Sequence, residues 1–355
     1  MGEEVALVLN GVPYTKSALL QKALGLGVAA PEYERSFWNF VASWYDENDY
    51  IEVSTSGSTG APKTMRVKKQ HMANSARMTC AALELKEGAS ALLCLSPAYI
   101  AGKMMVVRAI VGKLNLTLVE PSGMPQVEGY YDFCAMVPMQ LFNLTTTATG
   151  LEALNKISKL IIGGGAVSSN LRKQIAELMV TCYSTYGMTE TVSHIALKQL
   201  NGKGQQQAYH PMHGVKVGVN SKGCLVIDAP QVSADLVETT DMVQLLDDGT
   251  FHILGRYDNI INSGGVKISP EEVEHKLSGC SSTHFAISSV PDERLGEMVV
   301  IAIEGQADCI FNFKDILTTF EVPRKVFYLD KIPTTANGKI DRRALKELLK
   351  KSKAE

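Results

Sequence analysis

The chain has 355 residues, of which 45% are hydrophobic and 20% are charged, and its formal net charge at pH 7 is -2. This length allows a large buried core and a second domain, and the small net charge argues against nucleic-acid binding driven by bulk electrostatics. No apolar run approaches membrane-spanning length. Seven scattered cysteines without a CxxC pair indicate buried thiols. The first residues lack a secretory pattern, so we expect a cytoplasmic protein.

The first part of the chain predicts strands that alternate with helices. Short apolar runs predict buried strands at 91–96, 114–120, 133–138, 159–165 and 180–187. Stretches of helical length lie between them at 102–113 and 170–179, and Ser168 or Ser169 is expected to cap the second helix. This alternation predicts an α/β fold with mixed, largely parallel sheets flanked by helices.

The composition changes after about Gln199, where polar and glycine-rich residues begin. Antiparallel strands are expected at 223–230 and 242–254, and the second run turns at Asp248-Gly249. Ser269, Pro270 and Glu272 predict the start of a new helix.

Strands and a basic terminal helix complete the chain. We predict a large domain over 1–257 and a small mobile α+β domain over 258–355.

The stretch STSGSTGAPKTM, residues 54–65, reads like a phosphate-binding loop. Gly57 and Gly60 permit positive φ, so that backbone N–H groups can converge, and hydroxyls with the Lys63 ammonium can hold a polyphosphate. A Walker A loop needs glycine where Pro62 stands, and proline has no N–H to offer a phosphate. The alternative is a polar surface loop.

Three later stretches accompany this loop: YGMTE at 186–190, TTDMVQLLDDGTFHILGRYDN at 239–259 and PTTANGKIDR at 333–342. The four stretches, in this order, resemble the adenylate-forming superfamily of acyl-CoA synthetases, amino-acid adenylation domains and beetle luciferases. The resemblance covers the chain from about residue 50 to its end. It implies that a carboxylate attacks the α-phosphorus of ATP and that a thiol, usually that of coenzyme A, then displaces AMP.

The resemblance implies roles in phosphate and metal binding. The loop residues that would hold the β- and γ-phosphates are Ser54, Thr55, Ser56, Gly57, Ser58, Thr59, Gly60 and Lys63. Thr189 would contact phosphate and act with Glu190, the expected Mg²⁺ ligand, in catalysis.

The resemblance also implies a nucleoside site. Tyr186, followed by Gly187, would stack on adenine, Asp241 would accept hydrogen bonds from both ribose hydroxyls, and Arg256 would help to hold ribose and phosphate. Adenine would closely approach the backbone of Gly163, Gly164, Gly165 and Ala166.

The C-terminal residues would serve two half-reactions in turn. Lys339 would draw the carboxylate and the α-phosphate together during adenylation. The small domain would then swing about Asp258, so that the loop at 262–267, with Gly264 and Gly265, lines a pantetheine tunnel.

Two segments, at 95–109 and 186–202, are similar to the o-succinylbenzoate–CoA ligases of menaquinone biosynthesis, a branch of that superfamily. Fifty-three residues precede Ser54, fewer than in most relatives, and we expect a small acid rather than a long acyl chain.

This acid is a dianion, and its second carboxylate needs a partner. The candidates are Lys103, Ser193 and His194; alternatively, Lys103 only starts a helix and His194 is structural. Tyr99 stands where the family's acyl-pocket motif usually has His.

Other functions remain open. They are another aryl- or acyl-CoA ligase, a stand-alone adenylation domain that charges a carrier protein, and a nucleotide-binding regulatory module without activity. The predicted ligands are ATP, Mg²⁺, coenzyme A and a small carboxylate. We expect neither nucleic acid nor membrane insertion, and a homodimer is left open.

Overall fold

The structure is a computed structural model that describes residues 3–27, 29–55, 63–277, 283–305, 313–335 and 340–352. The chain divides into two compact units. Unit 1 comprises Met1–Val167, Gln174–Lys216 and Ile227–Val237, and unit 2 comprises Ser168–Lys173, Val217–Val226 and Glu238–Glu355. The sequence predicted one boundary between 257 and 258, whereas the two compact units exchange several shorter segments; the predicted boundary stays a prediction.

Unit 1 contains a nine-stranded sheet in the order β11-β10-β9-β8-β7-β5-β6-β1-β2. Its strands are β1 Val5–Leu9, β2 Val12–Thr15, β5 Ser90–Leu93, β6 Asn115–Leu118, β7 Tyr131–Met136, β8 Ile157–Ile162, β9 Thr181–Gly187, β10 His194–Gln199 and β11 His210–Pro211. The six strands from β1 to β9 in this order pair in parallel, whereas β2, β10 and β11 are antiparallel. The largely parallel α/β sheet predicted from the sequence is therefore confirmed.

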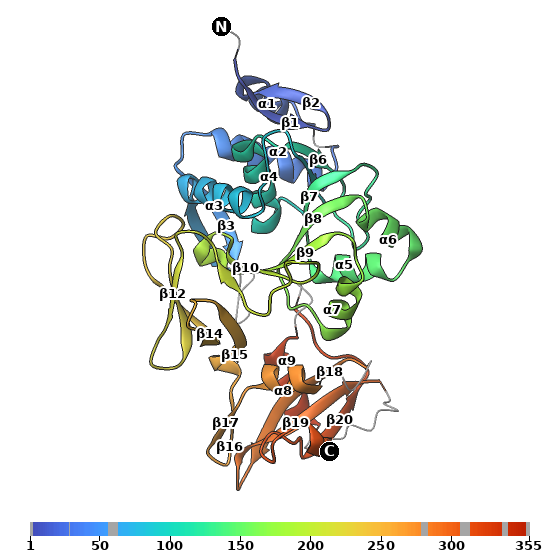
Figure 1. Ribbon diagram of the computed structural model, residues 1–355, viewed down its shortest axis with the longest axis vertical. Helices are drawn as coiled ribbons and strands as arrows, with labels where there is room; N and C mark the ends of the chain where they lie inside the picture. Colours follow the sequence, from blue (N-terminus) through green and yellow to red (C-terminus); the bar gives the residue numbers. More distant parts are fainter. Residues whose placement is uncertain are drawn as a thin grey trace. The chain divides into compact units, whose positions relative to one another are not determined.

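Helices connect and cover these strands. They are α1 Lys16–Leu24, α2 Glu32–Tyr45, α3 Lys69–Ala82, α4 Ile100–Gly112, α5 Pro138–Thr145, α6 Ala148–Leu154 and α7 Ser169–Ala176. Figure 1 shows α3 and α4 side by side on one side of β7 to β9, with α5 and α6 on the other side. The cap of α7 is Ser168, whose Oγ accepts a hydrogen bond from the Leu171 N–H at 3.2 Å.

Two smaller sheets complete the first 256 residues. Strands β3 Tyr50–Thr55 and β4 Lys63–Lys68 form an antiparallel pair. The other sheet contains β12 Lys216–Val219, β13 Cys224–Asp228, β14 Val237–Leu245 and β15 Phe251–Arg256. The predicted turn at Asp248-Gly249 joins β14 to β15, and Gly249 has the positive φ of +80° that such a turn requires.

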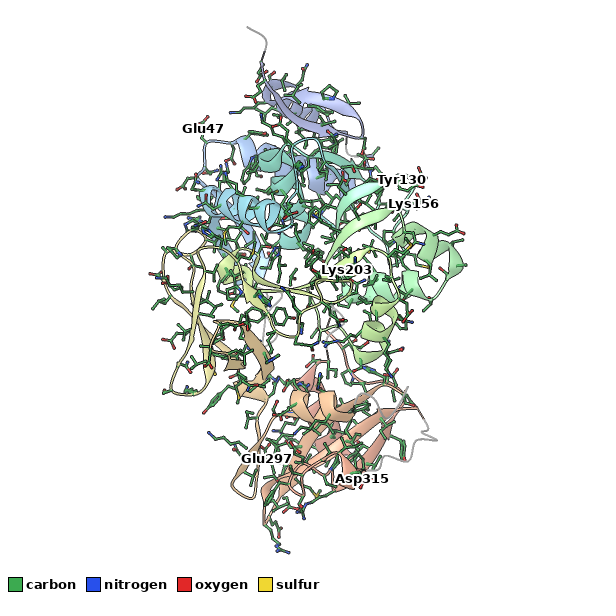
Figure 2. The ribbon with its side chains drawn as sticks, in the orientation of Figure 1. Glu47, Tyr130, Lys156, Lys203, Glu297 and Asp315 are labelled. Atoms are coloured by element: carbon green, nitrogen blue, oxygen red, sulfur yellow. The ribbon has the colours of Figure 1, made fainter. Side chains whose placement is uncertain are left out.

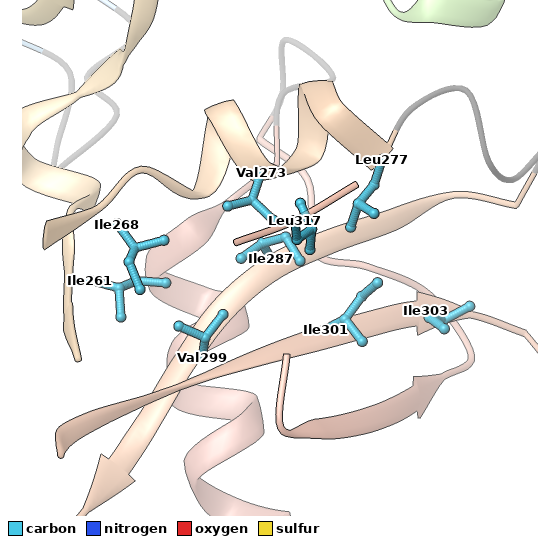
Figure 3. Packing of buried hydrophobic residues seen from close by; sticks show 9 residues of the cluster. All are labelled: Ile261, Ile268, Val273, Leu277, Ile287, Val299, Ile301, Ile303 and Leu317. Carbon is cyan, nitrogen blue, oxygen red and sulfur yellow. The ribbon is translucent and has the colours of Figure 1, made fainter. Parts of the chain in front are cut away.

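The C-terminal part of unit 2 contains a five-stranded sheet with helices on it. Its elements are β16 Ile261–Ser263, β17 Val266–Ile268, α8 Pro270–Leu277, β18 Phe285–Asp292, β19 Gly296–Glu304, β20 Lys325–Leu329 and α9 Arg342–Lys351. Val273 and Leu277 of α8 pack against Ile287 and Ile301 of the sheet (Figure 3). Leu345 and Leu349 of α9 belong to a second cluster with β18 and β19. Because each helix buries one stripe of apolar residues, this α+β layer has a core of its own.

The predicted start of α8 is also found, since the Glu272 N–H donates to Ser269 Oγ at 3.3 Å. Five cysteines are free and buried, as expected: Cys80, Cys94, Cys134, Cys182 and Cys224. Within the described ranges, no helix has the length and apolar character needed to cross a membrane.

Candidate active site

The predicted substrate and nucleotide segments of unit 1 follow the carboxyl ends of neighbouring parallel strands. Strand β5 leads into the segment with Tyr99, β8 leads into Gly163, and β9 ends at Gly187. The order β9-β8-β7-β5 brings these three strand ends to the same edge of the sheet. In open α/β sheets, ligands bind outside this edge.

The glycines after β8 lie close to the neighbouring strand. A Cβ on Gly163 would lie 2.6 Å from Thr185 Oγ1, and the Gly163 N–H donates to the Met136 carbonyl at 3.2 Å. Gly164 has a φ of +78° and is exposed, as is Ala166. This backbone thus presents little side-chain bulk, which suits the predicted approach of adenine.

Tyr186, the predicted adenine-stacking residue, is only 8% exposed. Its ring centre lies 6.0 Å from that of Tyr209, whose hydroxyl is 2.7 Å from Ser184 Oγ. The Lys198 ammonium lies 4.6 Å from the Tyr209 ring centre. Tyr186 is therefore held in place by an aromatic neighbour, and its stacking on adenine stays a prediction.

The turn after β9 is strained. Val192 has a φ of +67°, and the Ser193 N–H donates to the Thr191 carbonyl at 2.7 Å. Positive φ is costly for a β-branched residue and occurs mainly at functional sites. A Cβ on Gly187 would lie 2.3 Å from the Ser193 carbonyl oxygen, so the turn presses tightly against the strand end. This turn fixes where Glu190 and Ser193 lie.

Glu190, the predicted magnesium ligand, is exposed in the short helix η1 Thr189–Thr191. In the described part of the chain, no three His, Cys, Asp or Glu side chains group together as a metal site. Magnesium commonly uses one or two carboxylates together with substrate phosphates and water. The exposed carboxylate of Glu190, next to the predicted nucleotide segment, fits that requirement.

A chain of polar side chains crosses the buried space between α3, α4 and β10. Arg108 Nη2 donates to Ser193 Oγ at 2.9 Å, and Ser193 Oγ lies 3.4 Å from His194 Nδ1. His194 Nε2 lies 3.1 Å from Thr79 Oγ1, whose hydroxyl donates to the Ser75 carbonyl. Because that hydroxyl proton is already used, His194 Nε2 must carry the donated proton, and Nδ1 is left to accept.

The charges in this cluster follow from burial. Burial and the Arg108 guanidinium hold the pKa of His194 well below its usual value, so the imidazole is neutral. Burial lowers the pKa of Arg108 to about 10, which leaves it charged at neutral pH. Its Nε has no hydrogen-bond partner among the described residues. A buried cation with an unused donor is costly unless an anion arrives.

Arg108 was not among the residues predicted from the sequence, although it lies within the segment 95–109. The available signal was a single cation inside the apolar helix MMVVRAIV. The predicted pair Ser193 and His194 is brought together with it.

Lys103 has other partners. Its ammonium donates to the Ala98 carbonyl at 2.9 Å and lies 6.0 Å from the Phe40 ring centre, and burial lowers its pKa. Tyr99 is 66% exposed and precedes α4. Roles for Lys103 and Tyr99 in substrate binding stay predictions.

Unit 2 brings three predicted residues together. Asp241 and Arg256 are cross-strand partners in β14 and β15, with Arg256 Nε 3.9 Å from Asp241 Oδ1. Arg256 Nη2 also lies 3.3 Å from Asp258 Oδ2 and donates to Thr240 Oγ1. The guanidinium therefore links the predicted ribose carboxylate to the predicted hinge residue.

The predicted CoA-side loop is a hairpin tip. Gly264 and Gly265, with φ of +59° and +84°, join β16 to β17. At the base of the hairpin, the Asn262 N–H donates to Glu297 Oε2 at 3.0 Å; Glu297 is labelled in Figure 2.

The predicted phosphate-binding segment and the predicted catalytic lysine lie largely outside the described residues. Strands β3 and β4 pair Thr55 with Lys63 and Ser54 with Thr64, so the segment predicted to bind phosphate joins the ends of two paired strands. Lys339 lies outside the described residues, and so do the side chains of Thr55 and Lys63. The predicted phosphate-binding residues between these two strands are also outside them: Ser56, Gly57, Ser58, Thr59 and Gly60.

Comparison with known proteins shows the family of this chain. Residues 32–230 match the model of the family described as AMP-binding enzyme. The chain belongs to this family. The crystal structure of an acyl-CoA synthetase (AMP-forming)/AMP-acid ligase II-like protein from Dyadobacter fermentans is 33% identical. That match covers 93% of this chain and 97% of that one, with a TM-score of 0.63.

Two further relatives of this AMP-binding enzyme have more specific names. The 2-succinylbenzoate–CoA ligase of Escherichia coli is 27% identical over 86% of this chain and 70% of its own length. The structure of o-succinylbenzoate coenzyme A synthetase from Bacillus subtilis, in complex with ATP and magnesium ion, is 18% identical. It covers 97% of this chain and 96% of its own, with a TM-score of 0.73, and that likeness shows the fold. The expected superfamily is thereby confirmed.

Proposed function

We propose that this AMP-binding enzyme joins o-succinylbenzoate to coenzyme A through an acyl-adenylate, with release of AMP and pyrophosphate, in menaquinone biosynthesis. The proposal is supported by the family, and by a ligase of E. coli and a synthetase of B. subtilis that carry this substrate in their names.

The observation that carries the choice of acid is the buried Arg108. A monocarboxylic acid needs only the charges that bring its reacting carboxylate to ATP. A dianion needs a second cation, and a guanidinium can hold a carboxylate through two parallel hydrogen bonds. Arg108 Nη2 donates to Ser193 Oγ, its Nε is without a partner among the described residues, and Ser193 lies four residues after Thr189. This placement suits a second carboxylate near the nucleotide.

The chain's own residues would divide the work as follows. The segment between Thr55 and Lys63 would bind the β- and γ-phosphates, and Asp241 with Arg256 would orient the ribose. Glu190 would hold Mg²⁺, which neutralises phosphate charge when bound. Lys339 would supply the ammonium that counters repulsion between carboxylate and α-phosphate.

The hairpin tip with Gly264 and Gly265 would admit the pantetheine chain of coenzyme A. Asp258 would be the hinge between the two half-reactions. A cytoplasmic setting is part of the proposal and rests on the sequence alone, whereas the oligomeric state stays open.

The first test is product analysis by mass spectrometry with ATP, coenzyme A and o-succinylbenzoate. We expect o-succinylbenzoyl-CoA, AMP and pyrophosphate in equal amounts. Pyrophosphate exchange across a panel of aryl and acyl acids then compares this acid with its rivals. A stronger signal from a monocarboxylic acid, or no turnover of any acid, would count against the assignment.

The second test concerns Lys339. In Lys339→Ala we expect adenylate formation to fall by about three orders of magnitude, whereas thioester formation from supplied acyl-adenylate stays within about twofold of wild type. Equal loss in both half-reactions would contradict the exchange of loops.

A further inference from the structure

Two partly buried groups of opposite charge meet at the beginning of α9. Arg342, the first residue of this helix, contacts Glu274 of α8 through two hydrogen bonds: Nη2 donates to Oε2 at 2.7 Å and Nη1 donates to Oε1 at 3.1 Å. Nη1 also donates to the Ile287 carbonyl of β18 at 3.1 Å, and the Ile287 N–H donates to Glu274 Oε1 at 2.7 Å. The pair therefore joins α8, β18 and α9.

A second carboxylate extends this contact to the predicted hinge. Arg342 Nε lies 2.9 Å from Glu271 Oε1, which also accepts a hydrogen bond from Asn259 Nδ2. Glu271 Oε2 accepts from Ser269 Oγ at 3.3 Å. Asn259 directly follows Asp258, so one guanidinium ties the helix start to the residue beside the hinge.

The contacts of Arg342 constrain its position. Burial raises the pKa of Glu274, and the adjacent Arg342 guanidinium opposes that effect. The two acidic side chains in turn raise the pKa of Arg342. A bidentate pair constrains both distance and orientation, which a lysine at the same place would not do. Each partner is costly to leave alone in this position, from which solvent is largely excluded.

The network lies at the foot of the segment that carries Lys339. Arg342 follows Lys339 by three residues. The Asp341 N–H donates to the Pro333 carbonyl at 2.8 Å, and Thr334 and Ile340 form an antiparallel bridge. The two ends of the segment 334–340 are thus held together, and Arg342 anchors that closed base to α8.

We propose that Arg342 is a positioning residue for adenylation, which fixes the base of the Lys339 segment and couples it to the hinge through Glu271 and Asn259. The inference rests on the proposed role of Lys339. It does not depend on which acid is activated, because the partners of Arg342 and Glu271 described above all belong to unit 2, whereas the predicted acyl segment belongs to unit 1.

The test is Arg342→Lys, which retains the charge but loses the bidentate contact. We expect the kcat of pyrophosphate exchange to fall between about ten- and a hundredfold, as for a misplaced reacting group, with the KM for ATP unchanged within about twofold. Thioester formation from supplied acyl-adenylate should stay within about twofold of wild type. The matched control is Lys350→Gln in the same helix, whose partner Glu347 is exposed, and it should leave both half-reactions unchanged.

A purely structural role would lower both half-reactions by the same factor, or would leave the exchange rate unchanged in the folded variant, and either result overturns the inference. Circular dichroism and thermal melting of each variant confirm that it is folded. Should wild type prefer another acid, the same comparison is made with that acid, so the substrate assignment can fail while this inference stands.

Discussion

Arg108 is buried and Arg342 is partly buried, and the two have opposite surroundings. Arg342 in unit 2 meets two carboxylates, Glu271 and Glu274, and its pKa is raised. Arg108 in unit 1 donates one hydrogen bond to a hydroxyl, its pKa is lowered to about 10, and its Nε has no partner in the described part of the chain.

This difference in pairing indicates that Arg342 holds the fold together and that Arg108 is available to bind a ligand. A buried cation that is fully paired contributes to the geometry of the fold, and its removal leaves a buried anion behind. A buried cation that is not fully paired destabilises the free protein and gains most when an anionic ligand arrives. Removal of Arg342 should therefore lower the stability of the protein, whereas removal of Arg108 should lower its affinity for the substrate.

The largest expected effect is a loss of stability when the contact between Arg342 and Glu274 is removed. Arg342→Met should lower the free energy of unfolding by about 3–5 kcal/mol, because Glu274, from which solvent is largely excluded, is then left without its cation. Urea denaturation measures this change. The double variant Arg342→Met with Glu274→Leu should recover most of the loss, and a double variant as unstable as the single one would show that the pair is not the cause.

A smaller effect should appear at Arg108. Arg108→Met should raise the KM for o-succinylbenzoate about 10- to 100-fold, since a charge-assisted hydrogen bond contributes about 1.5–3 kcal/mol. Steady-state kinetics should show a kcat near that of wild type and an unchanged KM for ATP. The exposed Arg77→Met on α3 is the control. Loss of stability similar to that of Arg342→Met would remove the distinction between the two arginines.

The smallest effect concerns the histidine beside Arg108. His194 has a folded-state pKa well below its usual value, so the unfolded chain binds a proton that the native state does not. Stability should therefore fall as pH drops below about 6.5, by up to about 1.4 kcal/mol per pH unit. Unfolding measured from pH 7 to 5 should be less pH-dependent in His194→Gln than in wild type. The exposed His213→Gln should keep the wild-type slope; equal slopes in all three proteins would contradict the assignment.

The repeating pattern of the central sheet was readable in the sequence. The runs at 91–96 and 133–138 overlap β5 and β7, and the apolar stretch at 102–113 covers most of α4. Strand–helix alternation is a local signal, which is why it survives without tertiary information. Asp241 and Arg256 were predicted through the resemblance, and their pairing does not follow from the Asp-Gly turn alone, because a register shift between Met242 and Val243 displaces the partner of Asp241 by one residue.

Contacts between distant residues were not readable. Arg108 and Ser193 are 85 positions apart, and only the parallel order of the strands brings their elements together. Lys103 had the expected charge but is held by Ala98 and Phe40, and Phe40 belongs to α2, for which no local pattern had been assigned. Tertiary pairing, rather than residue type, decides which cation is available to a ligand.

Glu190, the proposed magnesium ligand, is exposed and belongs to no group of three possible metal ligands among the described residues. A dication held mainly by this carboxylate would remain almost fully hydrated, so the nucleotide-free enzyme would have little affinity for it. Triphosphate oxygens would supply the missing charge, and the ion and ATP would then bind together. Magnesium titrated into nucleotide-free protein should leave its melting temperature unchanged, whereas adding the two together should raise it.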